Sequence, residues 1–241
     1  MNENRLQPLD VAKRFIADKF PSCQAAVMAG SVVRGEHTAT SDLDIVVFDD
    51  KVESAYRESF IAYDWPIEVF VHNFTSYKDF FKSDCEGARP SLPRMVSEGL
   101  IIIDSGVVRA IKVEADELLK KGPAMWSEKT IETKRYMLTD ALDDLIGSTN
   151  RSEELFIANT LADAIREFVL RTNGKWIGES KWVMRALNHY DENFAGRFVQ
   201  AFDVFYRTGV KSEVITLADE VLQAYGGRLF EGYSMGKGDR I

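Results

Sequence analysis

The stretch AGSVVRGEHTATSDLDIVVF, residues Ala29–Phe48, decides the fold. It follows the apolar run Ala25–Ala29, passes through a Gly-Ser turn and a polar loop, and ends in Leu43–Phe48, which is rich in β-branched residues. Such residues favour strands, so the pattern predicts two strands joined by a loop that contains a short helix. Because alternate residues of a strand share a face, Asp42 and Asp44 should present two carboxylates side by side.

Paired carboxylates repel each other, and a divalent cation with oxygen ligands is the usual means of keeping both ionised. Glu68 lies on a further predicted strand, Trp65–Val71, and can add a third carboxylate from the same face; Asp64 is the alternative. Three carboxylates can hold two Mg²⁺ ions for in-line phosphoryl displacement. We therefore predict that Asp42, Asp44 and Glu68 are both the metal ligands and the catalytic residues.

The Gly-Ser turn upstream predicts a phosphate site. Gly30 allows the backbone to approach a phosphate, and Ser31 offers a hydroxyl and an amide. Arg34 either donates to a phosphate or is solvated, and Ser41 is included among the nucleotide-binding residues. A Gly-Ser turn or an Asp-x-Asp motif alone is common, so the prediction depends on their order and on the strand that follows.

The rest of the chain divides into two parts. Residues 6–20 predict an opening helix and residues 100–103 a fourth, short buried strand, after which amphipathic helical patterns dominate. Gly122-Pro123 is a break between helices, so we expect one unit at 1–122 and an α-helical bundle at 123–241. The helical patterns run over residues 107–121, 128–146, 153–171, 181–189, 193–207 and 212–225.

The composition restricts partners and location. The chain has 241 residues, of which 45% are hydrophobic and 28% charged, with a net charge of −8 that disfavours general nucleic-acid binding. No apolar run is long enough to span a bilayer and no secretory signal is visible, so we expect a cytoplasmic protein without a membrane partner. Two cysteines are too few for a disulfide framework.

The stretch GSVVRGEHTATSDLDIVV resembles the signature of the DNA polymerase β-like nucleotidyltransferase superfamily: a Gly-Ser pair, an Asp-x-Asp motif and a later single carboxylate. The resemblance implies an α+β fold, with a nucleotidyltransferase domain at 1–122 built on a small mixed β-sheet flanked by helices. It also implies Mg²⁺-dependent transfer of a nucleoside monophosphate from a nucleoside triphosphate, with release of pyrophosphate.

A nucleotidyltransferase domain followed by a helical bundle is similar to the aminoglycoside adenylyltransferases of antibiotic resistance. The stretch NGKWIGESKWVMRAL, residues 173–187, resembles the region of those enzymes in which a lysine reaches the nucleotide phosphates, and Lys181 is the matching position. This resemblance implies that ATP donates AMP to a hydroxyl of a small molecule, an aminoglycoside-like antibiotic being one candidate, bound between the domains.

Several alternatives stay open at this stage. The acceptor could instead be a protein or RNA, or the chain could be a catalytically silent, antitoxin-like nucleotide-binding module. Retention of three clustered carboxylates argues against a silent module, since clustered charge is costly without a function. Glu154 and Asp163 are the candidates for a general base, and the sequence leaves a homodimer open.

Overall fold

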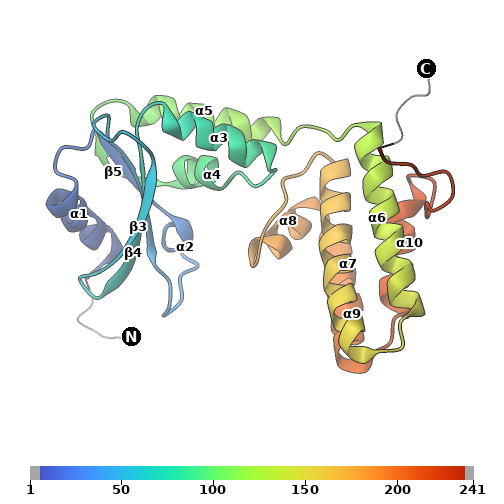
Figure 1. The fold of residues 1–241 in the computed structure, drawn as a ribbon. Coiled ribbons are helices and arrows are strands. Elements are labelled where there is room, and N and C mark those ends of the chain that lie inside the picture. The colour runs from blue at the N-terminus through green and yellow to red at the C-terminus, as the bar shows by residue number, and fades with distance from the viewer. Residues whose placement is uncertain (1–5, 237–241) are drawn as a thin grey trace, which may run out of the picture. The chain divides into compact units, whose positions relative to one another are not determined.

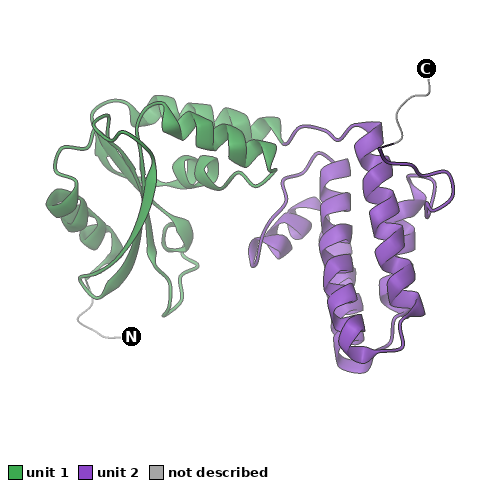
Figure 2. Ribbon diagram, in the orientation of Figure 1, with its two compact units in different colours: residues 1–122 green, residues 123–241 purple. Residues whose placement is uncertain are grey.

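The computed structural model describes residues 6–236. The chain divides between Gly122 and Pro123 into unit 1, residues 1–122, and unit 2, residues 123–241 (Figure 2). Gly122 has a φ of 76°, which ends the preceding helix, and Pro123 cannot continue it.

Unit 1 is built on a five-stranded mixed sheet in the order β3-β4-β2-β1-β5 (Figure 1). Only the central pair, β2 and β4, is parallel; the other neighbours are antiparallel. With the helices that follow, this sheet confirms the predicted α+β class. The strands are β1 Ala25–Ala29, β2 Leu43–Phe48, β3 Tyr56–Ala62, β4 Trp65–His72 and β5 Leu100–Asp104.

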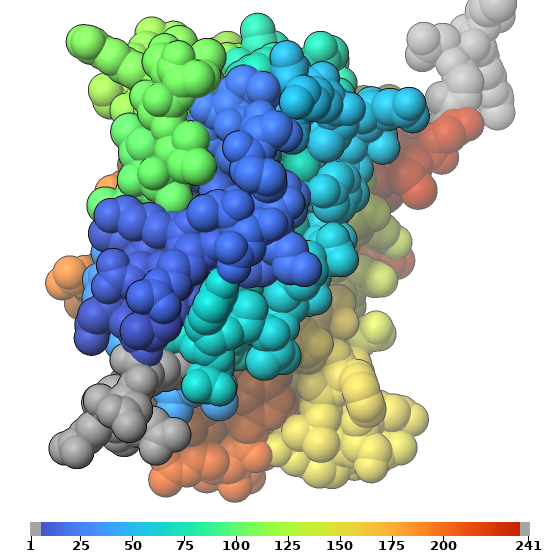
Figure 3. Space-filling view, turned by 90° about the vertical axis from the view of Figure 1, so that its left-hand side faces the viewer, coloured from blue at the N-terminus to red at the C-terminus, as the bar shows by residue number. Residues whose placement is uncertain are grey.

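Helices cover both faces of the sheet. The helix α1, Pro8–Lys19, packs on one face, where alternate residues of β2 such as Ile45 and Val47 are buried against it. Figure 3 looks onto this side, with α1 in dark blue and the β3–β4 hairpin, light blue to cyan, beside it. The other face is covered by α3, Ser76–Glu86, α4, Ser91–Glu98, and α5, Val108–Lys121.

Two features of the sheet differ from the sequence prediction. The strand β3 was not predicted; it is an edge strand whose residues are mostly exposed, so it lacks the apolar signal of a central strand. The prediction that residues 100–103 form a buried strand was wrong in one respect: β5 is the opposite edge, and Leu100 and Ile101 are 46% and 48% exposed.

Unit 2 consists of helices whose apolar faces pack together. Polar side chains cap three of them: Ser127 accepts a hydrogen bond from the Thr130 amide (3.1 Å), and Asn150 and Asp191 act in the same way. Within residues 6–236, no helix combines the length and apolarity that crossing a bilayer requires. The helices are α6 Glu128–Gly147, α7 Arg151–Thr172, α8 Trp182–Tyr190, α9 Glu192–Thr208 and α10 Ser212–Gln223.

Candidate active site

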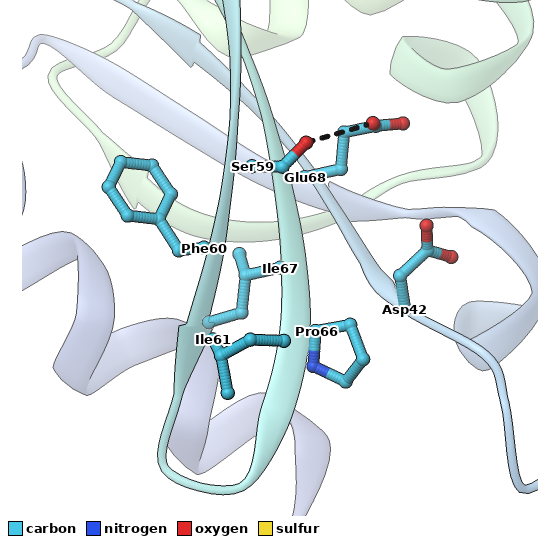
Figure 4. A pocket seen from close by; sticks show the side chains of 7 residues that line it. All are labelled: Asp42, Ser59, Phe60, Ile61, Pro66, Ile67 and Glu68. Atoms are coloured by element: carbon cyan, nitrogen blue, oxygen red, sulfur yellow. Dashed lines mark hydrogen bonds between the residues drawn. The ribbon is translucent and has the colours of Figure 1, made fainter.

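Three carboxylates, those of Asp42, Asp44 and Glu68, gather where the beginning of β2 lies beside the middle of β4. Each offers one oxygen, and these oxygens all lie within 4.8 Å of one another. The parallel register of β2 and β4 places Asp44 directly opposite Glu68, and Asp42 immediately precedes β2. Figure 4 shows Asp42 and Glu68 on adjoining segments. Residues distant in sequence therefore form one acidic triad.

The composition and burial of the triad fit a divalent metal ion. All three residues are half-buried, and their donors are carboxylate oxygens, which Mg²⁺ prefers. Asp64, the alternative to Glu68, lies instead in the exposed β3–β4 turn with a φ of 62°. It is outside the triad as the structure describes it.

The Gly-Ser turn lies directly against the triad. Since β1 and β2 are antiparallel with Ala29 opposite Asp44, the first residue after β1, Gly30, lies beside the Asp44 side chain. Gly30 has a φ of +79°, and a Cβ atom there would lie 1.9 Å from Asp44 Oδ2. Glycine is therefore required at position 30 by the Asp44 carboxylate as well as by the backbone conformation.

The two serines predicted to bind nucleotide lie next to each other. Ser31, in the short helix α2, Gly30–Val33, is 6% exposed, and its Oγ donates to Ser41 Oγ at 3.3 Å. Ser41 Oγ also accepts from the Thr38 amide at 2.9 Å, which closes the loop between α2 and β2. The loop thus fixes both hydroxyls close to the aspartates that follow.

Arg34 makes defined ion pairs. Its Nε contacts Glu36 Oε2 and its Nη1 contacts Glu98 Oε2, both at 3.0 Å. Glu98 is the last residue of α4, so Arg34 links the loop after α2 to that helix. The prediction of a phosphate contact for Arg34 would require it to leave or share these partners.

Two functional candidates on β3 were missed by sequence reasoning. Arg57 Nη2 forms an ion pair with Glu68 Oε1, and Ser59 Oγ donates to the same oxygen at 3.4 Å (Figure 4 shows the Ser59 bond). Their alternate spacing is the signal that could have found them, but it is informative only once Tyr56–Ala62 is recognised as a strand.

A hollow of about 250 Å³ adjoins the triad along the β3–β4 hairpin. Asp42 and Glu68 form one end of it, and Ile61, which is 80% exposed, and Pro66 give an apolar wall (Figure 4). The remaining residues that line it are Ser59, Phe60 and Ile67. The hollow therefore offers hydrogen-bonding groups beside an apolar surface.

The other predicted residues belong to unit 2. Lys181 is exposed at the start of α8. Glu154 is 8% exposed, and ion pairs with Lys211 (2.7 Å) and Arg151 (3.5 Å) lower its pKa, which makes it a weak base. Asp163 is 61% exposed and pairs with Arg166 at 2.6 Å.

The fold and the triad together define a class: a small mixed sheet that presents three carboxylates beside a Gly-Ser turn is the arrangement of a nucleotidyltransferase domain. Residues 9–89 match the model of the family described as "Nucleotidyltransferase domain". This match confirms the predicted resemblance over these residues: unit 1 contains a nucleotidyltransferase domain of the DNA polymerase β-like kind. Transfer from a nucleoside triphosphate is the activity that such a domain implies.

Comparisons with curated proteins and with solved structures do not identify the substrate. No curated protein matches the chain significantly. Among solved structures, a nucleotidyltransferase-like protein from Exiguobacterium sibiricum 255-15 is similar, with a TM-score of 0.47 and 10% sequence identity over 90% of this chain and 74% of that one. A likeness at this level does not bear on the substrate.

Proposed function

We propose that the chain transfers AMP from ATP to a hydroxyl of a small molecule and releases pyrophosphate, with divalent metal ions bound at the acidic triad. The convergence of Asp42, Asp44 and Glu68 beside the Gly30–Ser31 turn supports this proposal most directly. An aminoglycoside-like, polycationic acceptor is the class that the domain order favours, and a net charge of −8 is compatible with it.

Each residue of the triad has a distinct role in this proposal. Asp42 and Asp44 would hold two Mg²⁺ ions, and Glu68 would complete the ligands of the ion nearer the acceptor. Such ions, when bound, neutralise the phosphates and favour ionisation of the attacking hydroxyl. The Ser31 hydroxyl and amide would hydrogen-bond a terminal phosphate, and Lys181 would neutralise the departing pyrophosphate.

In this proposal the acceptor binds in the hollow beside Glu68. Ser59 and Glu68 can orient a hydroxyl by hydrogen bonds, while Ile61 and Pro66 can pack against an apolar ring face. Such positioning brings the acceptor oxygen next to the carboxylates and so reduces the entropy lost on reaching the transition state.

A screen of hydroxyl acceptors with radiolabelled ATP and Mg²⁺ tests the proposal, with labelled product and pyrophosphate as readouts. The Asp44→Asn variant should transfer several orders of magnitude more slowly, because it loses a charge that binds metal. Its metal-free melting temperature should match or exceed that of the parent, since a repulsion between carboxylates is relieved.

The control is Asp50→Asn, which removes the same charge from an exposed position after β2. It should keep the parent rate. Full activity of Asp44→Asn would refute the metal assignment, and the absence of transfer to any acceptor by the parent would favour a silent nucleotide-binding module.

A further inference from the structure

One face of the β3–β4 hairpin carries a cation directly beside the triad. The antiparallel register pairs Arg57 with Phe70 and Ser59 with Glu68, and alternate residues of each strand share a face. The Arg57 guanidinium lies 5.1 Å from the centre of the Phe70 ring and forms the ion pair with Glu68 Oε1. These two contacts therefore hold the Arg57 side chain beside the third carboxylate.

The two partners differ in their freedom to move. The Arg57 side chain is 62% exposed, whereas that of Glu68 is only 16% exposed and projects from a central strand. Arg57 can therefore swing into solvent at little cost, while Glu68 stays beside Asp42 and Asp44. A guanidinium also keeps its charge at any physiological pH, so it leaves Glu68 only by moving.

We propose that Arg57 is a built-in counter-ion of Glu68, which occupies the third carboxylate while no divalent ion is bound and is displaced when an ion binds there. The inference rests on the proposed function in one respect, namely that divalent ions bind at the triad. Arg57 offsets the repulsion among the carboxylates in the metal-free protein. It also competes with the ion for Glu68, and so lowers the affinity of the triad for metal.

Direct binding of Mn²⁺ to the full chain, measured without nucleotide by the loss of the free-ion electron paramagnetic resonance signal, tests the proposal. Arg57→Met keeps the apolar contact with Phe70 but removes the charge, and should bind Mn²⁺ about two- to fivefold more tightly, as expected for an exposed ion pair. Arg57→Lys keeps the charge and should stay within about twofold of the parent.

Two controls separate this local effect from a general change in charge. Arg109→Met removes an exposed positive charge from α5, which does not contribute to the triad, and should leave the affinity at the parent value. In a Glu68→Gln background, Arg57→Met should have no further effect, because the carboxylate for which both cations compete is gone.

The outcomes are distinct. Unchanged or weaker Mn²⁺ binding by Arg57→Met, beside normal binding by the parent, overturns the role of Arg57 and leaves the proposed function intact. An equal gain in Arg109→Met, or in the Glu68→Gln background, overturns it too. If the parent itself binds no Mn²⁺, both the counter-ion and the metal-dependent function are refuted. Should Arg57→Met fail to fold, Arg57→Gln repeats the test with the same expected gain.

Discussion

Gly30 illustrates how one residue serves both the backbone and the site. Its φ of +79° lies in the left-handed region, and the position of its missing Cβ is taken by the Asp44 carboxylate. Gly35, five residues later, has a similar φ of +70° but open space around it. A substitution at Gly35 therefore introduces backbone strain alone, whereas a substitution at Gly30 introduces backbone strain and a steric clash.

We expect Gly35→Ala to lower the free energy of unfolding by about 1–2 kcal/mol through left-handed strain alone. Gly30→Ala should cost more, because it also displaces the Asp44 carboxylate, and it alone should abolish Mn²⁺ binding. Urea denaturation and Mn²⁺ titration of both variants check this. Normal metal binding by Gly30→Ala would mean that the Asp44 side chain can move away without loss.

His72, the last residue of β4, makes stability depend on pH. It is 3% exposed, its Nδ1 lacks a hydrogen-bond partner, and its ring packs edge-on against Phe80. Burial lowers the pKa of His72 from 6.5 to about 4. The folded protein therefore binds this proton less readily than the unfolded chain does.

Because the pKa of His72 is depressed on folding, its contribution should be full above about pH 6.5 and lost as the pH falls towards 4. Relative to His72→Phe, the parent should lose about 3 kcal/mol more unfolding free energy between pH 7 and pH 4. Urea denaturation at a series of pH values measures the difference. Parallel pH profiles would show that His72 is not buried in its neutral form.

At the scale of single residues, the sequence was sufficient to predict that the carboxylates cluster, but not which residues contact them. The spacing of Asp42 and Asp44 at the start of an apolar strand was sufficient to expect clustered carboxylates. The contacts of Gly30 with Asp44 and of Arg57 with Glu68 depend on strand register, which is set by the packing of the whole sheet. No local pattern contains that information.

Among the elements, the β3–β4 hairpin holds Glu68 in place. Its two-residue turn, Tyr63-Asp64, has positive φ values of 52° and 62°, the pattern of a type I′ turn that suits two twisted strands. Glycine and asparagine are the preferred residues of such turns, so Asp64 carries some strain. Tyr63 is also tied to α1 by a hydrogen bond to Asp18.

Asp64→Gly should therefore stabilise the protein by about 0.5–1 kcal/mol, because glycine adopts the positive φ without strain. It should leave Mn²⁺ affinity unchanged, since Asp64 lies outside the triad. Thermal melts measure the change in stability, and the Mn²⁺ titration measures the metal affinity. Weaker metal binding in this variant would revive Asp64 as a ligand.

The strands were predicted to the extent that they are buried. The central strands β1, β2 and β4 show clear apolar runs, and their predicted bounds agree with the structure to within one residue. The edge strand β3 presents mostly exposed residues, such as Arg57 and Glu58, so its sequence lacks an apolar pattern. Its hydrogen bonds to β4 hold it in the strand conformation. Edge strands in general show a weaker apolar sequence pattern than the central strands of a sheet.

At the scale of the whole molecule, the part played by unit 2 is a proposal that rests on Lys181. If this lysine neutralises the departing pyrophosphate, Lys181→Ala should slow single-turnover transfer about ten- to a hundredfold while it weakens ATP binding much less. Lys120→Ala, at an exposed end of α5, is the control. Equal rates for both variants would leave Lys181 as a surface charge.

The triad and the Gly-Ser turn all come from residues 30–68, within the first of two units that are each continuous in sequence. During synthesis on the ribosome, this unit emerges complete before most of unit 2 has been translated. At about 5–20 residues per second, the second half needs roughly 6–24 s to follow. A nascent chain can therefore expose three clustered carboxylates to cellular Mg²⁺ for seconds, with Arg57 as the neighbouring cation that offsets their repulsion.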